Sequence, residues 1–371
     1  MSSVERVCAE YVEWLRAFLP ADYLERPERY RFDEDLRRRY QREACDEGWL
    51  VPQWPHGLGG RGLEPLEAVA VRVQSATLQA PKLLNIQSAG VVAPSLYSFG
   101  TDEQRERYLM PTLRGELNWA LGMSEPAAGS DLASLRTRAT RRDGSFFVSG
   151  QKVWTTQAHE SDLMLLLCRT DPEADRHRGI SCLLVDLDAP GITVRVIDTG
   201  WPDTDEFCEV FLDDVEVPED RLLGDLNGGW RVAMGSLSHE RDMIWVENYA
   251  AAERALRQAA ASIGAGGRPS LEAELGRRLT DVAALRLTGL RALESRLAGG
   301  PAPEFDILKL FGSETLQASI QLALDAGGEA ALGDPELLLD DFEALGATLY
   351  GGTSEIQRNI IAERVLGLPR G

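Results

Sequence analysis

The amino-acid sequence predicts an α+β protein of several domains, because helix-like and strand-like stretches are segregated along the chain. Apolar residues recur at three- and four-residue steps before residue 119 and after residue 225, which is typical of helices. Between these parts, short β-prone runs alternate with Gly, Asp and Pro, which favours a small sheet or barrel. A chain of 371 residues also exceeds what one core usually organises. We therefore expect a helical domain over 1–118, a β-domain over 119–225 and a second helical domain over 226–371.

The N-terminal third is predicted to be helical. Its first helix carries one apolar stripe, made of Val4, Val7, Tyr11, Trp14, Leu15 and Phe18. A second helix is expected over 33–47, ending at Gly48, and helical patterns resume over 63–113.

The loop between these helices, residues 50–62, is rich in Pro and Gly and contains a G-x-G-x-x-G match at Gly57–Gly62. That pattern binds dinucleotides only where it joins a strand to a helix. Because Pro52 and Pro55 precede it, a central strand is disfavoured there, and we interpret the segment as a surface turn.

The middle and last parts of the chain have different patterns. Strands are expected at 145–149, 163–169, 180–186, 192–197 and 209–212. A buried helix face is expected from Leu275, Leu279, Val282, Leu290, Leu293 and Leu297. Turns are expected at 264–269 and 298–303, where Gly and Pro gather.

Composition excludes several classes of protein. The net charge of −20 argues against nucleic-acid binding. The longest apolar runs, such as 163–168, are too short to cross a bilayer, and the first residues lack the pattern of a signal peptide. The five cysteines and four histidines are scattered, which favours free thiols over disulfides or a metal site. We therefore expect a cytoplasmic protein without a metal ion.

The basic residues are nearly all arginine. Only Lys82, Lys152 and Lys309 are lysine, which we interpret as codon bias. Because the net charge is strongly negative, an anionic ligand has to be held by local arginines and helix N-termini.

Five segments carry specific motifs. Leu121–Asp131 reads LGMSEPAAGSD and resembles the signature of the acyl-CoA dehydrogenase family. Four further segments resemble motifs of that family and follow the family's order: FGTDEQRERYLMP at 99–111, GQKVWTT at 150–156, DDVEVPEDRLLG at 213–224 and GTSEIQR at 352–358. The resemblance spans most of the chain and implies an N-terminal helical domain, a central β-barrel-like domain and a C-terminal four-helix bundle.

The resemblance also implies a cofactor and partners. The cofactor is FAD, the substrate is an acyl-CoA or related acyl thioester, and an electron-transfer flavoprotein or similar acceptor reoxidises the flavin. A homo-oligomer, dimer or tetramer, is implied as well. The implied cofactor-binding residues are Leu121, Met123, Ser124, Gly129, Ser130, Trp154, Thr155, Thr156, Arg268, Gly328, Thr353 and Glu355.

Family roles can be carried onto some of these positions. Ser124 would direct its hydroxyl at the flavin pyrimidine, while Trp154 and Thr156 would border the isoalloxazine. The implied substrate-binding residues are Ser130 near the pantetheine arm, Arg241 near the CoA moiety, and Gly351. Thr353 and Glu355 would lie at the ADP half of FAD, at a helix start where Ser354-x-x-Gln357 fits a capping box.

The catalytic base departs from the commonest pattern of the family. Straight-chain dehydrogenases carry a glutamate just before Gly-Thr-Ser, where this chain has Gly351. Other branches, including the isovaleryl-CoA dehydrogenases, carry the base on an earlier helix in the context L-x-x-E-R. Leu237–Arg241 matches that context, so the resemblance assigns the base to Glu240 and leaves room for a bulky acyl group at Gly351.

Other departures leave alternatives open. The stretch by which many relatives reach the partner subunit's FAD reads GAGGRPSL at 264–271, with Arg268 its best phosphate ligand, and the G-G-x-G turn becomes GGEA at 327–330. The chain could therefore be a non-catalytic or half-site subunit of a hetero-oligomer. It could also act on an acyl group bound to an acidic carrier protein, for which Arg37–Arg42 is the best docking patch, although a solvated helix face is favoured there.

Overall fold

The computed structural model describes residues 2–199, 207–264, 268–300 and 302–369, and in helix α7 it does not describe the side chains of residues 236–243. The chain divides into two compact units. The helical unit comprises Met1–Arg31, Leu63–Ala80 and Arg241–Gly371, and the sheet unit comprises Phe32–Gly62 and Pro81–Glu240. Along the chain, the predicted order of helices, then strands, then helices is confirmed.

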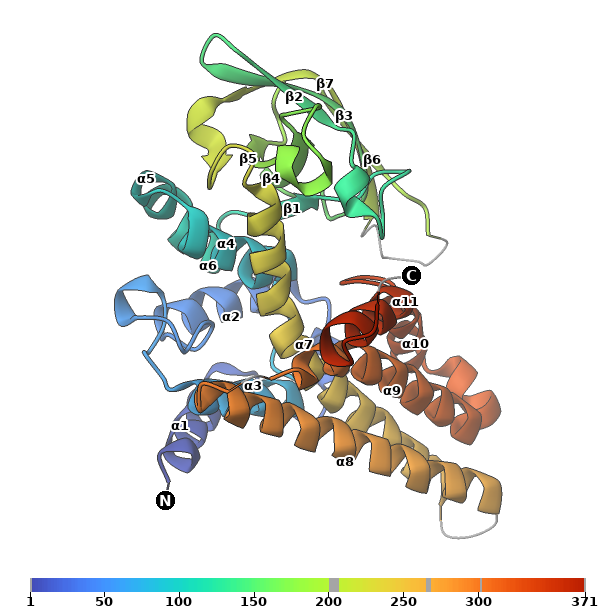
Figure 1. Cartoon of the computed structure of the whole chain (residues 1–371). Helices are drawn as coiled ribbons and strands as arrows, with labels where there is room; N and C mark the ends of the chain where they lie inside the picture. Colours follow the sequence, from blue (N-terminus) through green and yellow to red (C-terminus); the bar gives the residue numbers. More distant parts are fainter. Residues whose placement is uncertain (1, 200–206, 265–267, 301, 370–371) are drawn as a thin grey trace. The chain divides into compact units, whose positions relative to one another are not determined.

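Within the described residues, eight strands form one sheet in the sheet unit. Figure 1 shows this sheet. The strands are β1 (Trp119–Gly122), β2 (Arg138–Arg142), β3 (Ser145–Thr156), β4 (Leu163–Arg169), β5 (Ile180–Asp186), β6 (Ile192–Val196), β7 (Phe207–Pro218) and β8 (Leu222–Leu223). Their order is β6-β7-β3-β2-β4-β5-β8, with β1 beside β4. The pairing is antiparallel except that β1 and β2 run parallel to β4.

Strand β4 explains the long apolar run in the sequence, because both of its faces are covered. Leu163, Leu165 and Leu167 enter one hydrophobic cluster. Met164, Leu166 and Cys168 alternate with them and enter another. A strand buried on both sides needs no polar alternation.

Short helices cover one face of the sheet and contribute to the cluster that contains Leu163, Leu165 and Leu167. The helices of the sheet unit are α2 (Glu34–Asp46), α4 (Ala93–Phe99), α5 (Asp102–Gln104), α6 (Met110–Leu113) and the start of α7 (Gly229–Ile263). Leu96 and Leu113, from α4 and α6, pack with Leu165 of the sheet. The segment Gly57–Gly62 begins within a short 3-10 turn (His56–Leu58) and not after a strand, so the prediction of a turn is confirmed, although Gly59 and Gly60 are buried.

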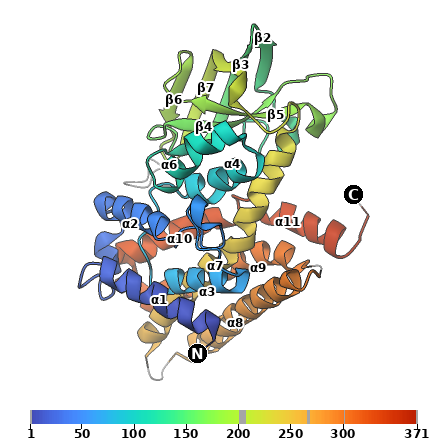
Figure 2. The same ribbon diagram turned by 90° about the vertical axis from the view of Figure 1, so that its left-hand side faces the viewer.

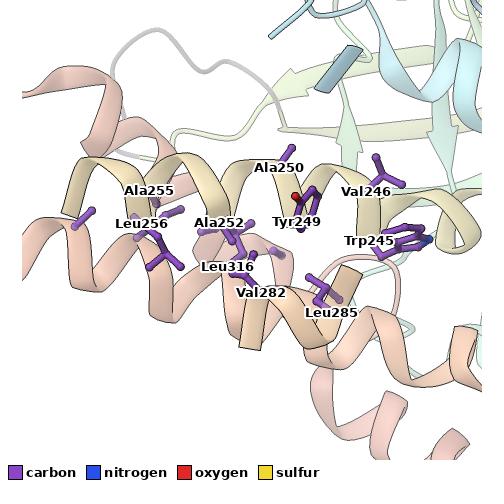
Figure 3. Close-up of a cluster of buried hydrophobic side chains, with 14 of the residues drawn as sticks. Trp245, Val246, Tyr249, Ala250, Ala252, Ala255, Leu256, Val282, Leu285 and Leu316 are labelled. Carbon is purple, nitrogen blue, oxygen red and sulfur yellow. The ribbon is translucent and has the colours of Figure 1, made fainter. Parts of the chain in front are cut away.

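The helical unit holds one large core. Its helices are α1 (Ser3–Phe18), α3 (Pro65–Thr77), the rest of α7, α8 (Pro269–Leu297), α9 (Glu304–Gly327), α10 (Pro335–Ala347) and α11 (Ser354–Ile360). Helix α8 packs along α9, and both views show it as a long helix at the edge of the bundle (Figures 1 and 2). Trp245 of α7 and Leu285 of α8 belong to the same buried cluster (Figure 3).

Two predicted features of the elements are wrong. Of the predicted buried face of α8, Val282 and Leu293 are in the core and Leu275 and Leu290 pack against it, as expected. Leu279 and Leu297 are exposed instead, because the face that packs inward runs through Val282, Leu285 and the small residue Gly289. Strands β3 and β7 are also much longer than 145–149 and 209–212, because each continues through polar residues that its partner strand holds by backbone hydrogen bonds.

The cysteines are free thiols, as the sequence predicted. Burial raises the pKa of Cys45 and of Cys168 to about 12, so both are protonated at neutral pH. Among the described residues, no helix is long and apolar enough to span a membrane, and no cluster of His, Cys, Asp and Glu is arranged to hold a metal ion.

The contact between α7 and α8 gives a test of the fold. A Cβ at Gly289 would lie 2.7 Å from the buried Trp245 ring, whereas a Cβ at Gly276, on the same helix, meets nothing within 4 Å. Both Gly→Ala changes gain helix propensity, so their difference isolates the clash. We expect Gly289→Ala to be about 1–3 kcal/mol less stable than Gly276→Ala in denaturant unfolding. Equal stabilities of the two variants would contradict this packing.

Candidate functional site

The signature segment leaves the sheet after β1 and forms a tight turn. The N–H groups of Glu125 and Ala128 each donate to the other residue's carbonyl, at N–O distances of 3.1 and 3.0 Å. The predicted cofactor residues are half-buried before this turn and exposed after it: Leu121, Met123 and Ser124, then Gly129 and Ser130.

A buried ion pair lies beneath this segment. The Nζ of Lys152, in β3, lies 2.9 Å from Oε1 of Glu125 and also donates to the carbonyl of Met123 at 3.0 Å. The N–H groups of Arg136 and Thr137 donate to the two Glu125 oxygens at 2.7 and 2.8 Å. Burial alone would raise the pKa of Glu125, but Lys152 and these donors outweigh it and hold the pKa below its ordinary value. Burial also lowers the pKa of Lys152, against the opposing pull of the carboxylate.

A β-bulge turns Trp154 out of the sheet. The register of β3 against β7 shifts between Lys152 and Thr155, and Trp154 has a φ of +58°. This left-handed backbone costs a bulky residue on the order of 1–3 kcal/mol, so the surroundings have to impose it. Trp154 is 58% exposed, and its ring meets Phe207 edge-on at a centroid distance of 5.9 Å. A strained and exposed aromatic residue indicates a binding surface.

One backbone hydrogen bond ties the bulge to the signature segment. The N–H of Val153 donates to the carbonyl of Ser124 at 3.0 Å, which brings Ser124 and Trp154 together. The side chain of Thr155 is fully buried, and its hydroxyl has no hydrogen-bond partner among the described residues. Thr156 is half-buried at the end of β3.

The exposed part of the signature segment is held from the neighbouring loop. Nη2 of Arg176 donates to Oδ1 of Asp131 at 2.6 Å, and Arg169 donates to the carbonyl of Ala133 at 2.7 Å. Ser130 therefore lies in a turn whose backbone is fixed on its C-terminal side, and the residue itself is exposed.

In the helical unit, the loop before α11 contains two glycines in left-handed conformation. Gly351 has a φ of +64° and Gly352 a φ of +100°. A Cβ at Gly351 would meet only Lys309 Cε, at 3.7 Å, so space is available and the backbone conformation is what favours glycine. Lys309 is buried and donates from Nζ to the carbonyls of Ala347 and Gly352.

The predicted capping box at the start of α11 is wrong by one residue. The N-cap is Thr353, whose Oγ1 accepts from the N–H of Ile356 at 3.3 Å. Gln357 donates instead to the carbonyl of Gly351, so its side chain is engaged by the loop. The pKa of Glu355 is lowered by its own backbone N–H and by the Thr353 hydroxyl, so its carboxylate is charged and does not favour a phosphate beside it.

Arg268 and Gly328 are brought together. Nη1 of Arg268 donates to the carbonyl of Ala326 at 2.6 Å, at the end of α9. Gly328 follows with a φ of +57°. These two predicted cofactor residues thus share one corner of the helical unit, although one guanidinium nitrogen is already engaged by the chain itself.

Glu240 and Arg241 lie on α7, whose backbone is helical from Gly229 to Ile263. Their side chains are outside the described residues, so their assignments stay predictions. In the proposed docking patch, Arg37 donates to the carbonyls of residues 82–84 and Arg38 pairs with Glu34. These contacts leave less of the patch to meet a carrier protein.

The sequence alone assigned no role to three buried residues that lie in or contact these segments: Glu125, Lys152 and Lys309. The scarcity of lysine was the signal that could have singled out Lys152 and Lys309. These two of the three lysines donate to carbonyls of segments predicted to bind the cofactor or substrate.

Comparisons with known proteins decide the family. Models of the acyl-CoA dehydrogenase N-terminal, middle and C-terminal domains match residues 8–116, 120–215 and 227–366. The acyl-CoA dehydrogenase IpdE1 of Mycobacterium tuberculosis is 36% identical over 386 residues, covering 100% of this chain and 99% of that protein. The chain belongs to the acyl-CoA dehydrogenase family. Members of this family are flavoprotein oxidoreductases that act on CH–CH groups of acyl-CoA thioesters.

Solved structures of the family have the same fold. The Tcur3481-Tcur3483 steroid ACAD is 28% identical with a TM-score of 0.84, covering 100% of this chain and 98% of that chain. The ChsE4-ChsE5 complex from Mycobacterium tuberculosis is 29% identical with a TM-score of 0.84, covering 100% of this chain and 99% of that chain. The predicted fold class, with helical N- and C-terminal domains and a central sheet domain, is confirmed.

The buried pair predicts a pH dependence of stability. Because the folded-state pKa of Glu125 is lowered, its stabilising contribution is present above about pH 4.5 and is lost as the pH falls through the folded-state value. Glu125→Gln lacks this contribution. We expect the difference in unfolding free energy between the wild type and Glu125→Gln to shrink from about pH 6 to about pH 3 in urea titrations. A difference that stays constant with pH would contradict the charged pair.

Proposed function

We propose that this chain is an FAD-dependent dehydrogenase that introduces a double bond between the α and β carbons of an acyl-CoA thioester. The observation that carries the proposal is Trp154, exposed in a strained backbone and bonded through Val153 to the Ser124 segment. Family membership supports the reaction class.

The residues present fit a flavin. Ser124 and the backbone N–H groups around it would donate to the pyrimidine edge, and Trp154 and Thr156 would border the ring system. Ser130 would lie near the pantetheine arm. Arg268, Gly328 and Thr353 are the candidate contacts of the ADP half, with Glu355 the weakest because of its charge. When bound, FAD supplies a two-electron acceptor that takes the β-hydrogen as hydride.

Glu240 is the proposed base. Its carboxylate would take the α-proton while the β-hydrogen leaves with its electron pair, so the C–C bond becomes a double bond conjugated with the thioester carbonyl. Gly351 stands where straight-chain relatives carry their glutamate, which supports a base on α7. Arg241 would bind the CoA moiety, and an electron-transfer flavoprotein or similar carrier would reoxidise the enzyme.

The acyl group is proposed to be bulky or branched. Gly351 has no side chain, and little lies within 4 Å of where a Cβ would be in the helical unit. Similarity to the Tcur3481-Tcur3483 steroid ACAD supports a large acyl group.

A substitution on α7 tests the base. Glu240→Gln keeps the size of the side chain but removes the proton acceptor, so we expect it to abolish bleaching of the flavin absorbance by acyl-CoA while FAD stays bound. Loss of a catalytic base typically slows a reaction about 10²–10⁴-fold. The substrate for this measurement is found first, by titrating the wild type with straight, branched and ring-containing acyl-CoA thioesters. The thioester that bleaches the flavin absorbance is then used for the variants.

The matched control is Glu247→Gln, an exposed glutamate two turns further along α7. It should bleach like the wild type. If the flavin absorbance of Glu240→Gln bleaches at the wild-type rate, Glu240 is not the base.

A second candidate function is a half-site subunit of a hetero-oligomer. It is favoured by the two-component names of the Tcur3481-Tcur3483 and ChsE4-ChsE5 proteins and by Arg268, whose guanidinium is engaged within its own chain. We expect such a subunit, expressed alone, to purify without FAD and to gain FAD when a second homologue is co-expressed. A single chain that is yellow and active, with its mass measured by light scattering as a homo-oligomer, would exclude this role.

A further inference from the structure

Two of the three lysines in the chain are buried, and both donate to main-chain carbonyls of segments assigned above to the cofactor. Lys152 donates to Met123 in the sheet unit, and Lys309 donates to Ala347 and Gly352 in the helical unit. Codon bias accounts for the scarcity of lysine but not for the burial of these two. Lys309 carries the further argument, because it joins a loop whose conformation is unusual.

The ammonium group of Lys309 is enclosed by the chain. The residue is 1% exposed, and Nζ lies 3.0 Å from the carbonyl oxygen of Ala347 and 2.6 Å from that of Gly352. Burying a charge is costly unless hydrogen bonds replace its water. Ala347 is the last residue of α10, where helix carbonyls carry partial negative charge and favour a cation. One ammonium group therefore joins the end of α10 to the loop before α11.

The loop is held on the same side by a second polar residue. Nε2 of the buried Gln357 donates to the carbonyl of Gly351 at 3.1 Å, so the carbonyls of Gly351 and Gly352 are both bound by side chains of the core. In a trans peptide, the C=O and the following N–H point in opposite directions. The N–H groups of Gly352 and Thr353 are therefore directed away from Lys309 and Gln357, and neither has a partner among the described residues.

We propose that Lys309 and Gln357 are positioning residues for the cofactor: they bind the Gly351 and Gly352 carbonyls and so fix the loop that presents Thr353. The proposal rests on the proposed function, which assigns Thr353 to FAD. Lysine suits the position because its compact ammonium group can rotate to donate to both carbonyls. The donors of a planar guanidinium group point in fixed directions. Neither residue touches the reacting atoms in this proposal.

The test is FAD affinity in the full-length chain. We expect Lys309→Met to weaken FAD binding about tenfold or more, because a charge-assisted bond to the loop is lost. The visible absorbance and circular dichroism of the bound flavin should change with it. Lys309→Arg keeps a charged donor, so its affinity for FAD should lie between that of the wild type and that of Lys309→Met. The control is Lys82→Met, the exposed lysine of the sheet unit, which should bind FAD like the wild type.

Stability separates positioning from a purely structural role. A structural role would lower the unfolding temperature of Lys309→Met but leave the FAD dissociation constant and flavin spectrum of the folded protein unchanged, and that result overturns the proposal. If Lys309→Met does not fold, Gln357→Met decides, because it releases only the Gly351 carbonyl and keeps the buried charge bonded. We expect it to weaken FAD binding about threefold to tenfold, and unchanged binding overturns the proposal.

Failure of the proposed function has a different signature. A wild-type chain that binds no FAD under any condition, including co-expression with a homologue, overturns the proposed function and this proposal together. FAD binding by the wild type that is indifferent to Lys309 and Gln357 overturns this proposal alone.

Discussion

The path of the signature segment depends on one buried ion pair, that of Lys152 and Glu125. A buried carboxylate is stable only when its oxygens are satisfied, and here an ammonium and two backbone N–H groups satisfy them. The same ammonium binds the carbonyl of Met123, so the signature segment cannot move without breaking a bond to a buried charge. Together with the bond from Val153 to Ser124, these contacts hold residues 123–125 against β3.

The bulge in β3 begins at the lysine of this ion pair. The Lys152 side chain points into the protein and bonds to Glu125. Between Lys152 and Thr155, the register of β3 against β7 shifts. Trp154 has a left-handed backbone within β3 and is exposed, and the bond from the N–H of Val153 to the carbonyl of Ser124 holds the adjacent backbone in place. The strain at Trp154 is thus offset by hydrogen bonds and by the buried charge beneath it, which is how a protein keeps an unfavourable conformation at a binding surface.

The helical unit uses the same chemistry at a different place. Lys309 binds two carbonyls at the junction of α10 and the Gly351–Gly352 loop, as Lys152 binds Met123. In both units a buried ammonium group holds backbone rather than a side chain of the surface. Side-chain hydrogen bonds of this kind fix a loop that has no regular partner strand or helix. The absence of a glutamate at residue 351 fits such a loop, since its left-handed backbone favours glycine.

The sequence by itself determined the order of helical and β segments, the buried strands β4 and β5, the free thiols and the family. These are properties of local composition and of contiguous motifs, which need no knowledge of distant contacts.

The sequence did not determine β2, whose residues RATRR carry almost no apolar signal. Nor did it determine the lengths of β3 and β7, because backbone pairing with distant strands extends them. It also placed Leu279 and Leu297 on the buried face of α8, where they do not lie, and it misplaced the cap of α11 by one residue. Those depend on which partner packs against Gly289 and on the engagement of Gln357 by Gly351. Only the tertiary structure revealed the roles of Lys152 and Lys309, because the carbonyls and the carboxylate that a buried charge requires come from residues far away in the chain.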